Sequence, residues 1–244
     1  MLIQQTIEKL HDLGLKTMAE ALVAQMDRGE ASSLTFDERL GLIVDREWMH
    51  RQNARIDRRV KAAHLKVQPS AEDIDYRHPR GLDRGVMQDL VSCRWIRAKG
   101  NLILCGPTGL GKTWIANALA HKACQEGFTA YYARVPRLVN ELAIARTDGT
   151  YLKVLGRLAK FDVLVLDDWA LSPLEGEAMH SILEVIDDRA GFRSTVLTSQ
   201  LPVGKWHGMV GDPSVADALL DRILGAAIQI NLKGETMRPR LPTV

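Results

Sequence analysis

One short stretch decides the fold of this chain: Gly106-Pro107-Thr108-Gly109-Leu110-Gly111-Lys112-Thr113. It matches G-x-x-x-x-G-K-[ST], the pattern of a phosphate-binding loop. Its glycines let the backbone curl so that several N–H groups point at one anion, and the helix that should follow adds a favourable dipole. Residues 106–113 are therefore expected to bind ATP, with Lys112 on the β- and γ-phosphates and Thr113 holding Mg²⁺.

The residues on either side favour this interpretation over a chance match. Asn101–Cys105 is a short apolar run that is consistent with a buried strand. After the loop, apolar side chains recur at helical spacing, at Ile115, Ala116, Leu119, Ala120 and Ala123. A strand before the loop and a helix after it are the surroundings that a phosphate-binding loop requires.

Strand and helix patterns alternate through the rest of the chain. Four further strands are predicted, at residues 129–133, 163–166, 194–198 and 227–230. A helix is predicted before the first strand, at residues 83–93, and further helices are predicted between the strands, at residues 137–145, 151–160, 177–189, 203–209 and 214–224. Such alternation predicts an α/β fold, with a parallel sheet covered on both faces.

The first part of the chain has a different pattern, because residues 1–75 read as helical throughout. Thr35 and Glu38 form a capping-box pattern, from which a long helix should run to about Leu65. A linker follows, so we expect a helical N-terminal domain over residues 1–75 and a nucleotide domain over residues 76–244. The second half of the long helix is basic, and it is either a DNA-facing surface or an ordinary solvated one.

Composition indicates the cellular environment and the kinds of partner to expect. The chain has 244 residues, a formal charge of +2 and a pI of about 8.4, so any affinity for nucleic acid must come from the distribution of charge. Cys93, Cys105 and Cys124 have no metal-binding spacing. No secretory signal or membrane-spanning run is visible, which predicts a cytoplasmic protein with reduced thiols and no membrane partner.

Acidic and polar residues end two of the predicted strands. Asp167 and Asp168 follow Leu164-Val165-Leu166, so the sheet should deliver both carboxylates beside the phosphates. Asp167 is expected to hold Mg²⁺ and Asp168 to orient and deprotonate the attacking water. At the end of the fourth strand, Gln200 is the first choice and Ser199 the second for a contact to the γ-phosphate or the water. The alternative is a simple turn.

Arg222 is a lone arginine in the otherwise apolar helical segment Leu219–Leu224. One interpretation is an ion pair with Asp217 or Asp221 in the same chain. The other is an arginine finger that is presented to the nucleotide of a neighbouring subunit and stabilises the charge of phosphoryl transfer.

The order GPTGLGKT, LVLDDW, TSQLP, LLDRI and LKGETMR resembles the IstB-like ATP-binding proteins. These are AAA+ helpers of insertion-sequence transposition, related to DnaC and DnaA. The N-terminal stretches EKLHDLGLKTMAEAL and LTFDERLGLIVDREW are also similar to that family. The resemblance implies a five-stranded sheet of order 5-1-4-3-2. It also implies that ATP drives assembly of a homo-oligomer on duplex DNA, with ATP at the subunit interface. This assembly is expected to bend the DNA and to recruit a transposase.

The resemblance also implies roles for residues and draws attention to two departures. It makes Arg222 the finger, Gln200 or Ser199 the first sensor, and Asp167 and Asp168 the acidic pair. Most AAA+ proteins have Asp-Glu there, and the shorter Asp168 predicts slow, assembly-stimulated hydrolysis. The tail after the last strand is too short for a helical lid, and Arg238 either replaces a second sensor or is a simple tail residue.

Two basic segments are candidates for phosphate contacts to DNA. The insertion between the second and third strands is favoured, because initiator-type relatives place DNA-facing helices there; its candidates are Arg134, Arg137, Arg146, Lys153 and Arg157. The second segment is the N-terminal basic helix, with Arg51, Arg55, Arg58 and Arg59. No base-reading motif is present in the sequence, which favours binding through phosphates and DNA deformation.

Three functions compete at this point. The leading hypothesis is a DNA transposition helper that hydrolyses ATP. A DnaC-like helicase loader is the close alternative, although loaders often have a metal-binding N-terminal domain and this chain has no Cys/His cluster. A small-molecule P-loop kinase is the remote alternative, which the acidic pair and the appended basic helices fit poorly.

Overall fold

The structure is a computed structural model that describes residues 2–27, 34–225 and 227–237. Its internal contacts divide the chain into two compact units, residues 1–58 and 59–244. Arg238, which the sequence suggests either as a second sensor or as a tail residue, lies outside the described residues.

The first unit is built from helices, as the sequence predicts. They are α1 (Leu2–Asp12), α2 (Lys16–Asp27) and the first part of α3 (Phe36–Ala62). The capping box is present, since Glu38 accepts a hydrogen bond of 2.8 Å from the amide of Thr35, and its own amide donates to the Thr35 hydroxyl. The buried carboxylate of Glu47 accepts from the amide of Met18 at 3.0 Å, which ties α3 to α2.

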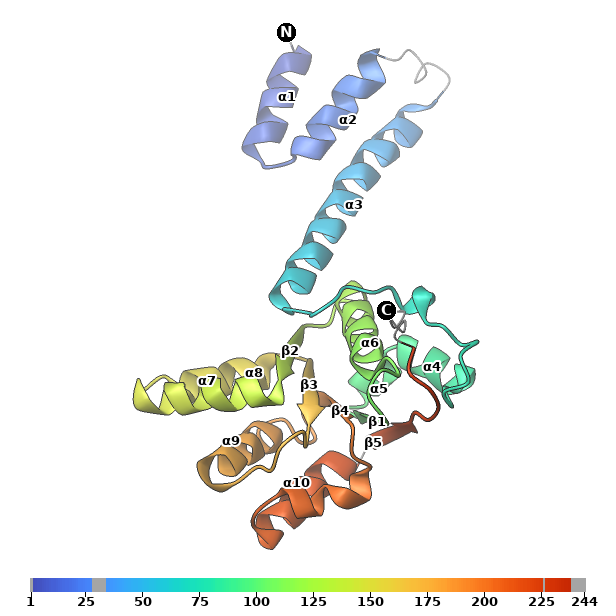
Figure 1. Cartoon of the computed structure of the whole chain (residues 1–244). Coiled ribbons are helices and arrows are strands. Elements are labelled where there is room, and N and C mark those ends of the chain that lie inside the picture. The colour runs from blue at the N-terminus through green and yellow to red at the C-terminus, as the bar shows by residue number, and fades with distance from the viewer. Residues whose placement is uncertain (1, 28–33, 226, 238–244) are drawn as a thin grey trace, which may run out of the picture. The chain divides into compact units, whose positions relative to one another are not determined.

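The second unit contains a parallel sheet of five strands in the order β2-β3-β4-β1-β5 (Figure 1). Its strands are β1 (Asn101–Cys105), β2 (Ala130–Arg134), β3 (Val163–Trp169), β4 (Ser194–Ser199) and β5 (Ala227–Asn231). Read from the other edge, this is the predicted order 5-1-4-3-2, and it confirms the AAA+ fold class. The strand predictions agree to within a residue except at β3, which continues through both aspartates to Trp169.

The connections of this unit are helical. Its helices are α4 (Arg84–Val91), α5 (Arg94–Arg97), α6 (Lys112–Gln125), α7 (Val135–Thr147), α8 (Tyr151–Lys160), α9 (Gly176–Asp187) and α10 (Pro213–Leu224). Residues 203–209, predicted as a helix, form two short 3-10 turns, Val203–Lys205 and His207–Met209. Pro136 lies in the first turn of α7, where its missing N–H costs nothing.

Apolar side chains cover both faces of the sheet, as expected for parallel strands. Ile103, Leu164 and Leu197 belong to a core that α7, α8, α9 and α10 complete. Figure 1 shows α6 on the opposite side of the sheet from α9 and α10. None of the helices within the described ranges is long and apolar enough to cross a membrane.

Candidate nucleotide-binding site

The phosphate-binding loop connects β1 to α6, as the sequence predicts. Gly106, Gly109 and Gly111 have φ values of 143°, 90° and 83°, a region that residues with a side chain rarely adopt. Gly111 directly precedes α6, so the loop opens onto the N-terminus of a helix of 14 residues. This geometry suits an anion, because helix N-termini present free N–H groups.

Lys112 lies at the start of α6 and turns back onto the loop. Its ammonium group donates to the backbone oxygens of Gly106 and Pro107 at 2.7 and 2.8 Å. Beside it is a cavity of about 610 Å³. The residues that line this cavity are Lys66, Val67, Thr108, Gly109, Gly111, Lys112, Thr113, Trp114, Arg134, Asp168, Thr198, Ser199, Gln200 and Met237.

Asp167 is almost completely buried and receives three hydroxyl groups. Thr113 donates to its Oδ1 at 2.7 Å, Tyr132 donates to its Oδ2 at 2.6 Å, and Thr198 donates to Oδ1 as well. Burial, and then this hydrogen bond to Asp167, raise the pKa of Tyr132, so the phenol stays a neutral donor. The structure thus brings together the two predicted Mg²⁺ ligands, Thr113 and Asp167. Hydroxyl and carboxylate oxygens are ligands that fit Mg²⁺.

Asp168 has an unusual backbone and a tight partner. Its φ of 60° is in the left-handed region, next to a register shift between β3 and β4. Arg134, the last residue of β2, places Nε and Nη2 at 2.9 and 2.6 Å from the same oxygen, Oδ2 of Asp168. This contact raises the pKa of Arg134. Arg134, a candidate for DNA contact in the sequence, therefore lies inside the nucleotide cavity.

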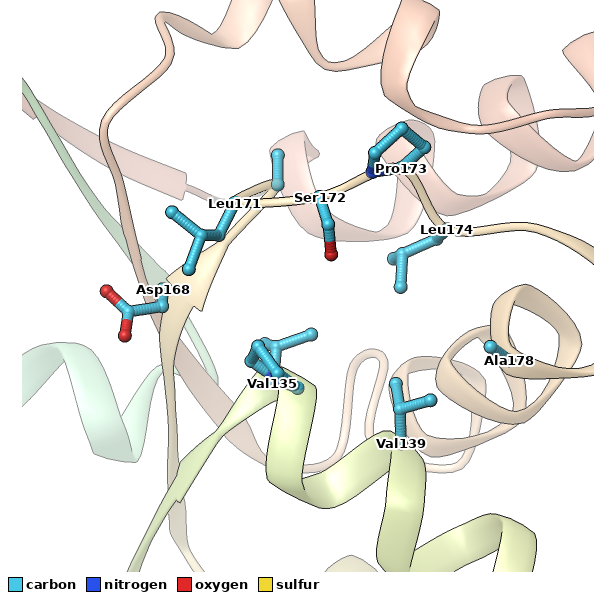
Figure 2. Close-up of a pocket in the computed structure, with 10 residues that line it drawn as sticks. Val135, Val139, Asp168, Leu171, Ser172, Pro173, Leu174 and Ala178 are labelled. Atoms are coloured by element: carbon cyan, nitrogen blue, oxygen red, sulfur yellow. The ribbon is translucent and has the colours of Figure 1, made fainter.

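Asp168 also borders a second, smaller cavity of about 90 Å³. Figure 2 shows Val135 and Val139 of α7 on one side of it and Leu171 to Leu174 on the other. The Asp168 carboxylate points away from this mainly apolar space. The small cavity therefore separates the acid from α9, and the carboxylate is directed to the nucleotide side.

The end of β4 supplies three polar residues, and they are used differently. Gln200 accepts a hydrogen bond of 2.8 Å from Thr108 of the loop. Ser199 donates to the backbone oxygen of Trp169 and accepts from Leu201. Thr198, which the sequence analysis did not select, contacts both acids, because its hydroxyl also accepts from the amide of Asp168 at 3.2 Å.

Thr198 and Tyr132 are the site residues that sequence reasoning missed. A threonine and a tyrosine are ordinary residues of a strand, so neither differs from a packing residue by its type alone. For Thr198, its position along the chain could have indicated its role. Thr198 ends a strand predicted to lie beside the one with the acids.

Arg222 lies on α10 and does not line its own cavity. Its guanidinium pairs with Asp187 at the end of α9 and donates to the backbone oxygen of Ala218 at 3.0 Å. The suggested ion pair within the chain therefore exists, but with Asp187 in place of Asp217 or Asp221. The side chain remains about one-third exposed, at 34%.

The remaining candidates for DNA contact differ in how far they are engaged. Arg146 pairs with Glu184 and Arg157 pairs with Glu141, whereas the side chains of Arg137 and Lys153 make no hydrogen bond or ion pair with any described residue. In the first unit Arg51 pairs with Glu47, and Arg58 donates to the carbonyl of Ala54 on its own helix. Arg55 and Arg59 also lie on α3, with Arg55 exposed and Arg59 half-buried.

Comparison with known proteins extends this picture. A Sinorhizobium fredii protein named as an insertion sequence ATP-binding protein is 46% identical over 98% of this chain and 97% of its own length. A Pseudomonas fluorescens protein, named as an ATP-binding protein of insertion sequence IS1162, is 52% identical over 83% of this chain and 88% of its own.

Solved structures share the fold at low sequence identity. DnaI aligns with a TM-score of 0.58 at 21% identity, over 70% of this chain and 91% of its own. AMPPCP-bound DnaA from Aquifex aeolicus aligns with a TM-score of 0.57 at 17% identity, over 70% of this chain and 51% of its own. The family described as IstB-like ATP binding protein matches residues 8–242. With nearly its whole length matched and relatives close to half identical, this chain belongs to the IstB-like ATP-binding protein family.

Proposed function

We propose that this protein is an ATPase that assembles on duplex DNA when it holds ATP, bends the DNA and recruits the transposase of an insertion sequence. The observation that carries the proposal is the meeting of Thr113 and Asp167 at 2.7 Å, with Lys112 on the same helix and Asp168 facing the same cavity. These are the parts that phosphoryl transfer requires. The relatives' names supply the insertion-sequence setting.

Thr113 and Asp167 would hold Mg²⁺, which when bound neutralises charge on the β- and γ-phosphates. Lys112 exchanges its backbone acceptors for phosphate oxygens, which are stronger acceptors because they are charged. Asp168 orients the attacking water and takes its proton. Gln200, which accepts a hydrogen bond from Thr108 of the loop, would contact the γ-phosphate or that water, and Ser199 is the second choice.

In this proposal, assembly brings the positive charge of Arg222 from one subunit to the ATP of its neighbour. Arg222 lies outside its own cavity, so as a finger it would act on the ATP of a neighbouring subunit. We also propose that residues 1–75 form a helical domain for contacts to DNA, to other copies or to partners, and that residues 76–244 form the ATPase domain. DNA contact is proposed for both basic segments. A DnaA structure that contains AMPPCP and single-stranded DNA shows this fold with both ligands.

Light scattering with and without ATP and duplex DNA tests this function. The wild-type protein should grow in mass only with ATP, and further with duplex. Lys112→Ala should stay small. Lys122→Ala is the matched control on the same helix, because Lys122 pairs with Glu126 one turn away and does not line the cavity. A wild-type monomer under every condition would contradict the proposal.

A helicase loader is the second candidate, because the DnaC helicase loader shares the fold with a TM-score of 0.54 at 20% identity. The two functions differ in their partner and in their DNA. A pull-down with a replicative helicase and with the transposase of the same insertion sequence separates them. Capture of the helicase together with a preference for single-stranded DNA would favour the loader.

A further inference from the structure

The residues after β5 pass along the phosphate-binding loop. We call Leu232–Met237 the C-terminal strap. At its start the amide of Leu232 donates to the backbone oxygen of Cys105 at 2.8 Å, and at its end the amide of Met237 donates to the backbone oxygen of Gly109 at 2.9 Å. The strap is thus fixed at both ends to the segment that precedes and forms the loop.

The glycines of the loop leave room for this strap. A Cβ atom at Gly106 would collide with the backbone of Leu232, and one at Gly109 would collide with the side chain of Thr236. These two glycines are therefore constrained by positive φ and also by the close approach of the strap. The strap therefore packs directly against both glycines.

Arg80 connects the end of the strap to the phosphate-binding loop. Its guanidinium is buried, with an exposed fraction of 2%, and its Nη1 donates to the backbone oxygen of Leu110 at 2.8 Å and to Sδ of Met237 at 3.0 Å. Its own backbone oxygen accepts from the amide of Lys233 at 3.0 Å. One buried side chain therefore joins the loop to Met237 and sets where that methionine lies.

Met237 reaches the nucleotide cavity, where it shares the lining with Val67 and Trp114. Trp114 is in the first turn of α6, and Val67 is held nearby because the amide of Lys66 donates to Asn117 of α6 at 3.0 Å. None of the three comes from β3 or β4, which carry the acids and Thr198. The cavity thus has an aromatic and aliphatic lining in addition to its polar, phosphate-directed one.

We infer that Val67, Trp114 and Met237 form the seat of the nucleobase, and that the C-terminal strap is a nucleotide-binding element because it delivers Met237 to that seat. An indole face and a thioether both pack well on a flat heteroaromatic ring. The strap thereby lies over the base. This inference rests on ATP binding by the loop and adds the residues that recognise the base.

A pair of ligands tests the inference on the full-length protein. ATP carries a base, and inorganic tripolyphosphate offers a similar chain of phosphates without one. Titration calorimetry should give a Kd for ATP that is about tenfold higher in Met237→Ala and in Trp114→Ala. The Kd for tripolyphosphate should change by less than about twofold in both, because stacking is absent. Met237→Leu, which keeps an apolar side chain of similar size, should bind ATP within about threefold of wild type.

Other outcomes overturn the inference. An equal loss of both ligands in Met237→Ala would mean that the strap only supports the loop. Unchanged ATP binding in both alanine variants would show that these side chains do not bind the nucleobase. Lys112→Ala should weaken the binding of both ligands. If the wild-type protein binds tripolyphosphate and Lys112→Ala does not, the phosphate site is supported even when the alanine variants at the base seat show no effect. Thermal melting of each variant checks that the fold is intact.

Discussion

Arg134 holds Asp168 by two nitrogens on a single carboxylate oxygen, at 2.9 and 2.6 Å. Arg134 is the last residue of β2 and directly precedes α7, the first helix of the basic insertion. The proposed catalytic base is therefore tied to the segment proposed to contact DNA.

Asp168→Asn should keep nucleotide binding and lose turnover. An amide cannot take the proton of the attacking water, and such proton transfer contributes about 10²–10⁴-fold to a rate. We expect kcat for ATP to fall by about 100-fold or more while the Kd for ATP stays within about threefold. A coupled ATPase assay and calorimetry measure the two quantities. Asp188→Asn, at an exposed aspartate after α9, is the control, and normal turnover in Asp168→Asn would remove the base assignment.

Arg134→Ala should raise the ATPase rate of the protein in the absence of DNA. The guanidinium occupies the Oδ2 oxygen of Asp168 and competes with water for it. Removing it should increase turnover by about threefold or more, since hydrogen bonds to charged groups contribute about 1.5–3 kcal/mol. Arg137→Ala, one turn further along and without a partner in the described chain, should leave that rate unchanged. A fall in the rate of Arg134→Ala would show that the arginine assists hydrolysis.

Tyr132→Phe should destabilise the fold by about 1–2 kcal/mol, because it removes one donor from the buried carboxylate of Asp167. The matched control is Tyr131→Phe, since Tyr131 stacks on Phe161 through its ring and its hydroxyl makes no described hydrogen bond. Urea unfolding of the three proteins gives the comparison. Equal stability of both variants would mean that the Tyr132 hydroxyl contributes nothing measurable.

Arg222→Ala should leave ATP binding by single subunits unchanged and lower ATP turnover in the assembled state by about 10³-fold, the contribution typical of an arginine finger. Asp187→Ala separates this role from a structural one. It breaks the same ion pair but leaves the arginine in place. We expect Asp187→Ala to retain ATPase activity on duplex DNA. If the two variants lose activity equally, the ion pair and not the finger is what matters.

Arg137→Ala and Lys153→Ala should each weaken duplex binding and its salt dependence. Each phosphate contact contributes about 0.9 to the slope of log K against log salt concentration. These two side chains make no ion pair within the described chain, whereas Arg157 is engaged with Glu141. Arg157→Ala should therefore have the smaller effect on the slope. Anisotropy titrations of labelled duplex at several salt concentrations provide the measurement.

The sequence by itself determined the fold class, the five strands and the phosphate-binding loop. These features are written in adjacent residues, because the glycines, Lys112 and Thr113 of the loop are contiguous and strand and helix periods are local. The capping box at Thr35 and Glu38 was predictable for the same reason. The strand order came from the family resemblance.

Only the tertiary structure decided which polar residues meet. Arg134 and Asp168 are 34 positions apart, and Arg80 and Met237 are 157 positions apart, so no local pattern relates them. Residue type did not distinguish Arg134 from the other arginines of the insertion, nor Thr198 from Ser199 and Gln200. Folding brings the ends of β2, β3 and β4 to one edge of the sheet, and the contacts there depend on register and side-chain direction, which the sequence does not state.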